Sequence, residues 1–153
     1  MTPERPSWFR IRTRRLVPPT VPWKPGRGTR PRVLLECPAE ESPGIVASVL
    51  DRAGFDVVVC EGPVADRRCP LAAGEGCPTI HAVDVVVNML GASTAEQAEV
   101  LPALAQAGPR PPAIVAMVDD PSEVGSDAHV LGRRVSGGAM VAAVTDALDV
   151  TER

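Results

Sequence analysis

From residue 32 onward, short aliphatic runs alternate with other segments, and this alternation constrains the fold more than any other feature. Such short, valine-rich runs are typical of strands buried on both faces of a parallel sheet. Helical patterns follow the first, third and fifth runs, which predicts right-handed crossovers. The spacing favours a three-layer, doubly wound α/β domain over residues 32–150, with five strands in the order 2-1-3-4-5. The runs lie at 33–35, 56–60, 83–90, 113–118 and 130–131.

The predicted helices have recognisable ends and apolar faces. Ser42-Pro43 begins the first helix and Gly54 ends it. Ser93–Glu96 has the pattern of a capping box and begins the second. The third covers residues 138–150. The expected apolar faces comprise Ile45, Val46, Val49, Leu50 and Ala53 in the first helix, Ala98, Leu101, Leu104 and Ala105 in the second, and Val141, Val144 and Leu148 in the third.

Residues 1–31 differ from the rest in charge and in proline content. Residues 1–32 contain nine Arg or Lys and one acidic residue, a net charge of +8, whereas the remainder has seven basic and 18 acidic residues, a net charge of −11. Seven of the 17 prolines lie in residues 1–31, so we expect a disordered basic arm. The arm could bind nucleic acid or fold back on its own acidic domain, and the second interpretation is favoured because no nucleic-acid-binding signature accompanies the charge. Trp8 and Trp23 are expected to cover apolar patches of the domain.

The order of the segments and the phrase Ala53-Gly54-Phe55-Asp56-Val57 resemble a response-regulator receiver domain over residues 32–150. The resemblance implies a flavodoxin-like fold, but the residues that a receiver uses for phosphorylation are replaced. Cys37 and Pro38 stand where an acidic pair would hold Mg²⁺, with Glu36, Glu40 and Glu41 nearby. Asn88 stands in place of the phosphoacceptor aspartate, Val118-Asp119 in place of the hydroxyl residue, and Arg133 or Arg134 in place of the lysine. The chain is therefore expected to be a pseudo-receiver that is not phosphorylated on aspartate.

The connection at 61–82 is rich in cysteine, glycine and proline, and it replaces the helix that the fold would place there. Cys60, Cys69, Cys77 and His81 have the spacing C-x8-C-x7-C-x3-H, which supplies three thiolates and one imidazole for a tetrahedral zinc or iron site. The alternatives are a regulated dithiol and plain thiols, since a free cysteine often serves as a small buried hydrophobe.

The carboxyl ends of the strands are the predicted ligand or partner edge, with Cys37, Asn88, Asp119 and Asp120 as candidates. Cys37 follows a strand, where a nucleophile can be activated, but the nearby glutamates would repel an anionic substrate. Asp119 and Asp120 could hold a cation or simply cap a helix.

The sequence therefore predicts a non-catalytic regulatory or interaction module, not an enzyme, with a protein partner. The alternative function is a metal-binding or thiol redox-responsive protein that uses the cysteine loop. No apolar run reaches the length of a membrane span and no secretory signal is present, so a cytoplasmic location is expected.

Overall fold

The computed structural model is organised around one parallel sheet, and it describes residues 14–15, 23, 29–38, 40–64, 67–91, 94–120 and 128–151. The strands stand in the order β1-β3-β2-β4-β5-β6, and every neighbouring pair is parallel. Without β1, this is the predicted five-stranded 2-1-3-4-5 order, and the flavodoxin-like fold is confirmed. The strands are β1 (Arg14–Arg15), β2 (Arg32–Glu36), β3 (Asp56–Cys60), β4 (Val85–Asn88), β5 (Ala113–Met117) and β6 (His129–Leu131).

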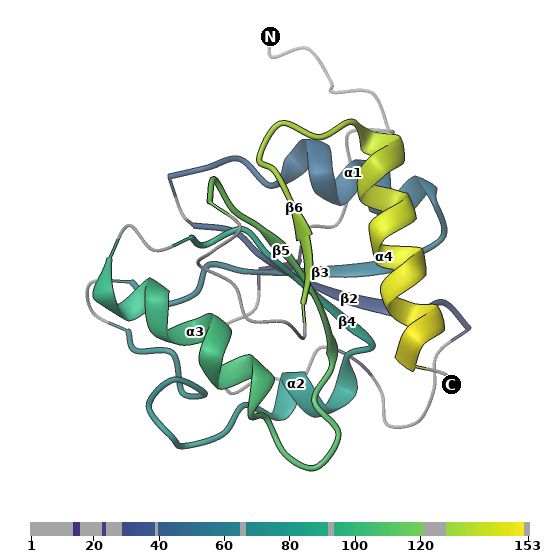
Figure 1. The fold of residues 1–153 in the computed structure, drawn as a ribbon. Helices are drawn as coiled ribbons and strands as arrows, with labels where there is room; N and C mark the ends of the chain where they lie inside the picture. Colours follow the sequence, from purple (N-terminus) through teal and green to yellow (C-terminus); the bar gives the residue numbers. More distant parts are fainter. Residues whose placement is uncertain are drawn as a thin grey trace, which may run out of the picture.

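Helices cover both faces of the sheet and complete three layers. α1 (Gly44–Arg52) and α4 (Gly137–Thr151) lie on one face, whereas α2 (Pro78–Ala82) and α3 (Ala95–Ala105) lie on the other (Figure 1). Successive strand residues point to opposite faces, so β2 contributes to both cores. Val33 and Leu35 pack in the core with α1 and α4, and Leu34 packs in the core with α2 and α3.

The predicted apolar face of the first helix is partly wrong. Ile45 is 79 % exposed, Ala53 is exposed, and the buried residues of α1 are Ala47 and Leu50. At 100° per residue, Ile45 lies on the side of the helix opposite to these two. The small Ala47 side chain lets the helix approach the sheet closely. The end of the helix is as predicted, because Gly54 has a φ of +101°, which favours glycine.

The predicted face of α3 also needs correction, whereas that of α4 is confirmed, because Val144 is buried and Val141 and Leu148 pack against the same core. Thr94, not Ser93, caps α3, and its hydroxyl accepts a hydrogen bond from the Gln97 amide at 3.1 Å. The predicted inward residues Ala98 and Ala105 are exposed. The helix begins one residue later than the capping-box pattern suggests. Gln97, Val100 and Leu104 are buried in α3, and Met140, Ala143, Val144 and Ala147 are buried in α4.

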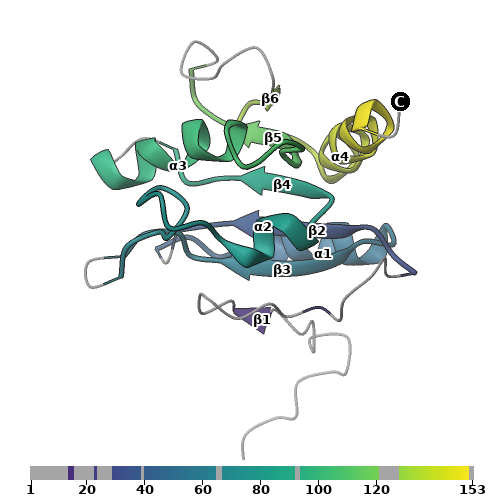
Figure 2. The same cartoon turned by 90° about the horizontal axis from the view of Figure 1, so that it is seen from below.

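Two described pieces of the N-terminal arm contact the domain. Arg14 and Arg15 pair with Val58 and Val59, so β1 lies along the outer edge of β3 (Figure 2). Trp23 is 8 % exposed and packs in the core with α2 and α3, as predicted. The predictions for Trp8 and for disorder in most of residues 1–31 lie outside the described residues.

The described parts of the connection between β3 and β4, residues 61–64 and 67–84, contain no full-length helix, as the composition of the connection predicts. It forms an isolated bridge between Val64 and Arg67, a turn at 70–74 and the five-residue helix α2. In the part of the chain that the structure describes, no helix is long and apolar enough to cross a membrane.

Candidate functional site

Three side chains stand in a row where β3, β2 and β4 end. Glu36 is in register with Cys60 on one side and with Asn88 on the other. Registered residues of neighbouring strands point to the same face, here the face of Leu34. The register therefore places a carboxyl group, a thiol and an amide together beneath the cysteine loop.

The central pair of this row is a buried hydrogen bond. The Asn88 Nδ2 amide donates to Glu36 Oε2 at 2.6 Å, and both residues are buried, at 2 % and 4 % exposure. Burial raises the pKa of Glu36 to about 7, although the hydrogen bond from Asn88 acts in the opposite direction. Burial therefore favours the protonated, neutral form of Glu36 in the folded protein more than in a free glutamate side chain.

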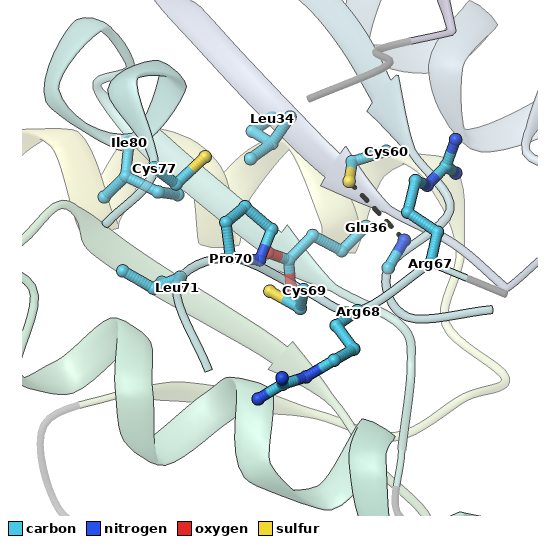
Figure 3. Close-up of a pocket in the computed structure, with 11 residues that line it drawn as sticks. Leu34, Glu36, Cys60, Arg67, Arg68, Cys69, Pro70, Leu71, Cys77 and Ile80 are labelled. Carbon is cyan, nitrogen blue, oxygen red and sulfur yellow. Dashed lines mark hydrogen bonds between the residues drawn. The ribbon is translucent and has the colours of Figure 1, made fainter. Parts of the chain in front are cut away.

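A pocket opens beside Glu36, and three thiols line it (Figure 3). Cys60 comes from the end of β3, Cys69 from the loop and Cys77 from the residue before α2. The volume is about 390 Å³ when the open mouth is included. The pocket thus combines a carboxyl group, three thiols and apolar walls, with two arginines also in its lining. The lining residues are Leu34, Glu36, Cys60, Gly62, Arg67, Arg68, Cys69, Pro70, Leu71, Cys77 and Ile80.

Burial keeps at least two of these thiols protonated. It raises the pKa of Cys60 to about 12, and the nearby Glu36 adds to this effect, while the Gly62 amide, which donates to Cys60 Sγ at 3.4 Å, lowers it. Burial also raises the pKa of Cys69. Because the thiolate is the nucleophile and the metal ligand, these groups are unreactive until something displaces their protons.

The structure brings together three of the four predicted metal ligands. Cys60, Cys69 and Cys77 share the pocket, whereas His81 is solvent-exposed on α2 with its ring beside Gly108. All four cysteines are free. Among the described residues, no group of three or more His, Cys, Asp or Glu side chains is arranged to hold a metal ion.

Cys37 lies on the opposite face of the sheet, in the core with α1 and α4, and is 1 % exposed. Burial raises its pKa to about 11, and the charge of Glu41 adds to the effect. A buried, protonated thiol beside carboxylates is poorly suited to nucleophilic attack.

Arg133 connects three loops at the carboxyl edge. Its Nη1 lies 2.9 Å from Glu41 Oε1, in the loop after β2, and its Nε lies 3.4 Å from Asp119 Oδ2, in the loop after β5. The guanidinium also crosses the loop after β4, where a Cβ on Gly91 would lie 2.5 Å from Nη2. A side chain at Gly91 would therefore displace Arg133.

The four predicted edge residues fall into two groups. Asp119 and Asp120 are exposed beyond the end of β5, whereas Asn88 and Cys37 are buried. Arg133 is one of the two residues expected in place of the receiver lysine, but its ion pairs with Glu41 and Asp119 and the burial of Glu36 are not evident from the spacing of the sequence. One feature of the sequence could have indicated that Glu36 is buried. It lies two positions after the inward-facing Leu34, and because side chains alternate along a strand, both point to the same buried face.

No protein-family model matches this chain, and no curated protein is significantly similar to it.

Proposed function

We propose that the chain is a non-catalytic regulatory module with a pseudo-receiver scaffold, and that it binds a protein partner at the carboxyl edge of its sheet. The observation that carries this proposal is the buried Glu36–Asn88 hydrogen bond. It fills the place where a receiver would carry its phosphoacceptor, with an amide that cannot form an acyl phosphate.

The charged rim of the same edge supports the binding part of the proposal. Arg133 holds the loops that carry Glu41 and Asp119 together, and Asp119 presents a side chain that is 81 % exposed. A fixed set of loops with outward carboxylates suits recognition of a basic patch on a partner. The raised pKa values of Cys37 and Cys60 argue against a nucleophilic enzyme. We propose that the chain binds its partner in the cytoplasm, where the four thiols would stay reduced.

The phosphorylation part is tested by incubation with acetyl phosphate and Mg²⁺, followed by intact-mass measurement. The wild-type chain is expected to gain no phosphoryl group, because it has no aspartate at position 88. Asn88→Asp and Asn88→Ala are the matched variants. Stable, Mg²⁺-dependent phosphorylation of the wild-type chain at the carboxyl edge would contradict the proposal.

The binding part is tested by chemical cross-linking of the full chain in lysate of its source. Asp119→Lys is expected to abolish a cross-linked protein that the wild type captures. Asp149→Lys makes the same charge change near the far end of α4, at an exposed position, and is expected to keep the partner. Equal capture by both variants would place the partner elsewhere.

A second candidate function is a response to a soft metal ion or an oxidant, and the presence of three thiols in the lining of one pocket favours it, although a metal ion would have to draw them closer together. A metal such as Zn²⁺ would displace the thiol protons, since thiolates are the ligands. Alternatively, hydrogen peroxide would oxidise two thiols to a disulfide and be reduced to two molecules of water.

This function is tested on tag-free protein purified under reducing conditions, by metal analysis and thiol titration. Bound metal, with thiols protected until denaturation, is the expected result if the pocket is a metal site. Cys69→Ser should then lower the melting temperature about as much as a chelator does, whereas His81→Ala should have little effect. Absence of metal, with four thiols that stay free after peroxide treatment, would eliminate this function.

A further inference from the structure

The sheet face near β3 is covered by a side chain from outside the domain. In a doubly wound fold the connection between β3 and β4 normally supplies a helix at this place, but α2 has only five residues. Trp23 lies there instead, in a core cluster with Leu34, Val58 and Ile80. A segment distant in sequence therefore completes this layer.

Two polar contacts of the Trp23 side chain are of the kind that an indole makes. The Trp23 Nε1 donates to Asp56 Oδ2 at 2.9 Å, and the Arg32 guanidinium carbon lies 5.5 Å from the centroid of the ring. The Arg32 guanidinium is held in turn by its Nη1, which donates to the Ala82 carbonyl oxygen at 3.4 Å. A hydrogen-bond acceptor and a cation over the ring are features of a specific aromatic site.

Backbone pairing and charge bring the same segment to the domain. Among the described residues of the arm, Arg14 and Arg15 form β1 and pair with the outer edge of β3. Residues 1–32 have a net charge of +8 and the rest of the chain has −11. The contact thus resembles a short strand added to a sheet edge with one aromatic anchor, which is a common mode of peptide recognition.

We propose that the β3 edge and the Trp23 site form a docking groove for an extended, basic, tryptophan-bearing segment, which a second copy of this chain can supply. The groove is occupied in cis by Arg14, Arg15 and Trp23. A second copy is the partner of matching chemistry because every copy carries both the groove and the segment, and exchange of an identical element is a low-cost route to dimers. This groove is at the amino ends and outer edge of the strands, so the inference is independent of the function proposed for the carboxyl edge.

The acceptor for the test is the full-length Trp23→Ala chain, whose groove lacks its anchor. The probe is a fluorescein-labelled synthetic peptide of residues 11–27, followed by anisotropy. The variant is expected to bind this peptide at least about tenfold more tightly than the wild type, whose groove is occupied in cis. The same peptide with Trp23→Ala is the control and should not bind, and adding Asp56→Asn to the acceptor should weaken binding.

Each outcome of the binding experiment either supports or contradicts the proposal. Equal binding of the two peptides would mean that charge alone holds the segment, and a folded variant that binds no better than wild type would overturn the groove. If Trp23→Ala unfolds, the tryptophan peptide should restore its helical circular dichroism and the alanine peptide should not; absence of this rescue also overturns the proposal.

Wild-type chain refolded at high concentration should form dimers in sedimentation velocity, whereas Trp23→Ala should not. Monomers alone would restrict the segment to its own chain.

Discussion

Glu36→Gln is expected to stabilise the protein at alkaline pH and to remove most of the pH dependence that this carboxyl group causes. In the wild type, burial raises the pKa of Glu36 from 4.5 to about 7 in the folded state. Below pH 4.5 the group is protonated in both states and burial carries no charge penalty. Between about pH 4.5 and about 7 the unfolded chain ionises at this group while the folded chain keeps the proton, so the free energy of unfolding falls across this range and levels off above it.

The size of this fall follows from the pKa difference between the two states, and it amounts to roughly 3 kcal/mol. Glutamine keeps the shape of the side chain and its oxygen can still accept from Asn88. Urea unfolding at about pH 5 and about pH 8.5 measures the effect as a difference between variant and wild type. Glu99→Gln, at an exposed position of α3, is the control and should follow the wild type. Parallel pH profiles for Glu36→Gln and wild type would show that Glu36 is not protonated in the folded state.

Trp23→Ala is expected to lower the free energy of unfolding by about 3 kcal/mol, because it removes a large side chain from a core cluster. Trp23→Phe keeps an aromatic ring in the cluster but leaves Asp56 without the indole donor, and should cost about 1 kcal/mol. Both values come from urea unfolding followed by circular dichroism.

Ile45→Ala serves as the control because Ile45 is 79 % exposed, and its effect should stay within about 0.5 kcal/mol. If Trp23→Ala matched this control, the arm would contribute nothing to the stability of the domain.

The strand order could be predicted from the sequence because each segment shows by its own residues whether it forms a strand or a helix. Val57-Val58-Val59 and Val85-Val86-Val87 are too short and too branched for buried helices, and their spacing leaves few topologies. β1 could not be predicted, since Arg14-Arg15 has no apolar pattern and its pairing with β3 uses backbone groups that any residue supplies.

The candidate site was predictable only in part, for a related reason. Cys60, Cys69 and Cys77 are conspicuous in the sequence, and the structure places all three in one pocket. His81 shares their spacing pattern but is exposed on a short helix, whereas Glu36, which lies in an aliphatic strand, faces the thiols. Which side chain joins the pocket depends on the register of β2 with β3 and β4, and spacing along the chain does not contain that information.

The pairing of β1 with β3 has a consequence for the behaviour of the protein at high concentration. β3 is the sequence Asp-Val-Val-Val-Cys, a segment of high β propensity with little charge. An unpaired strand of this kind is a template for intermolecular sheets and amyloid-like aggregation. β1 occupies this edge beside Val58 and Val59, so we expect the arm to shield these backbone groups from pairing with another chain.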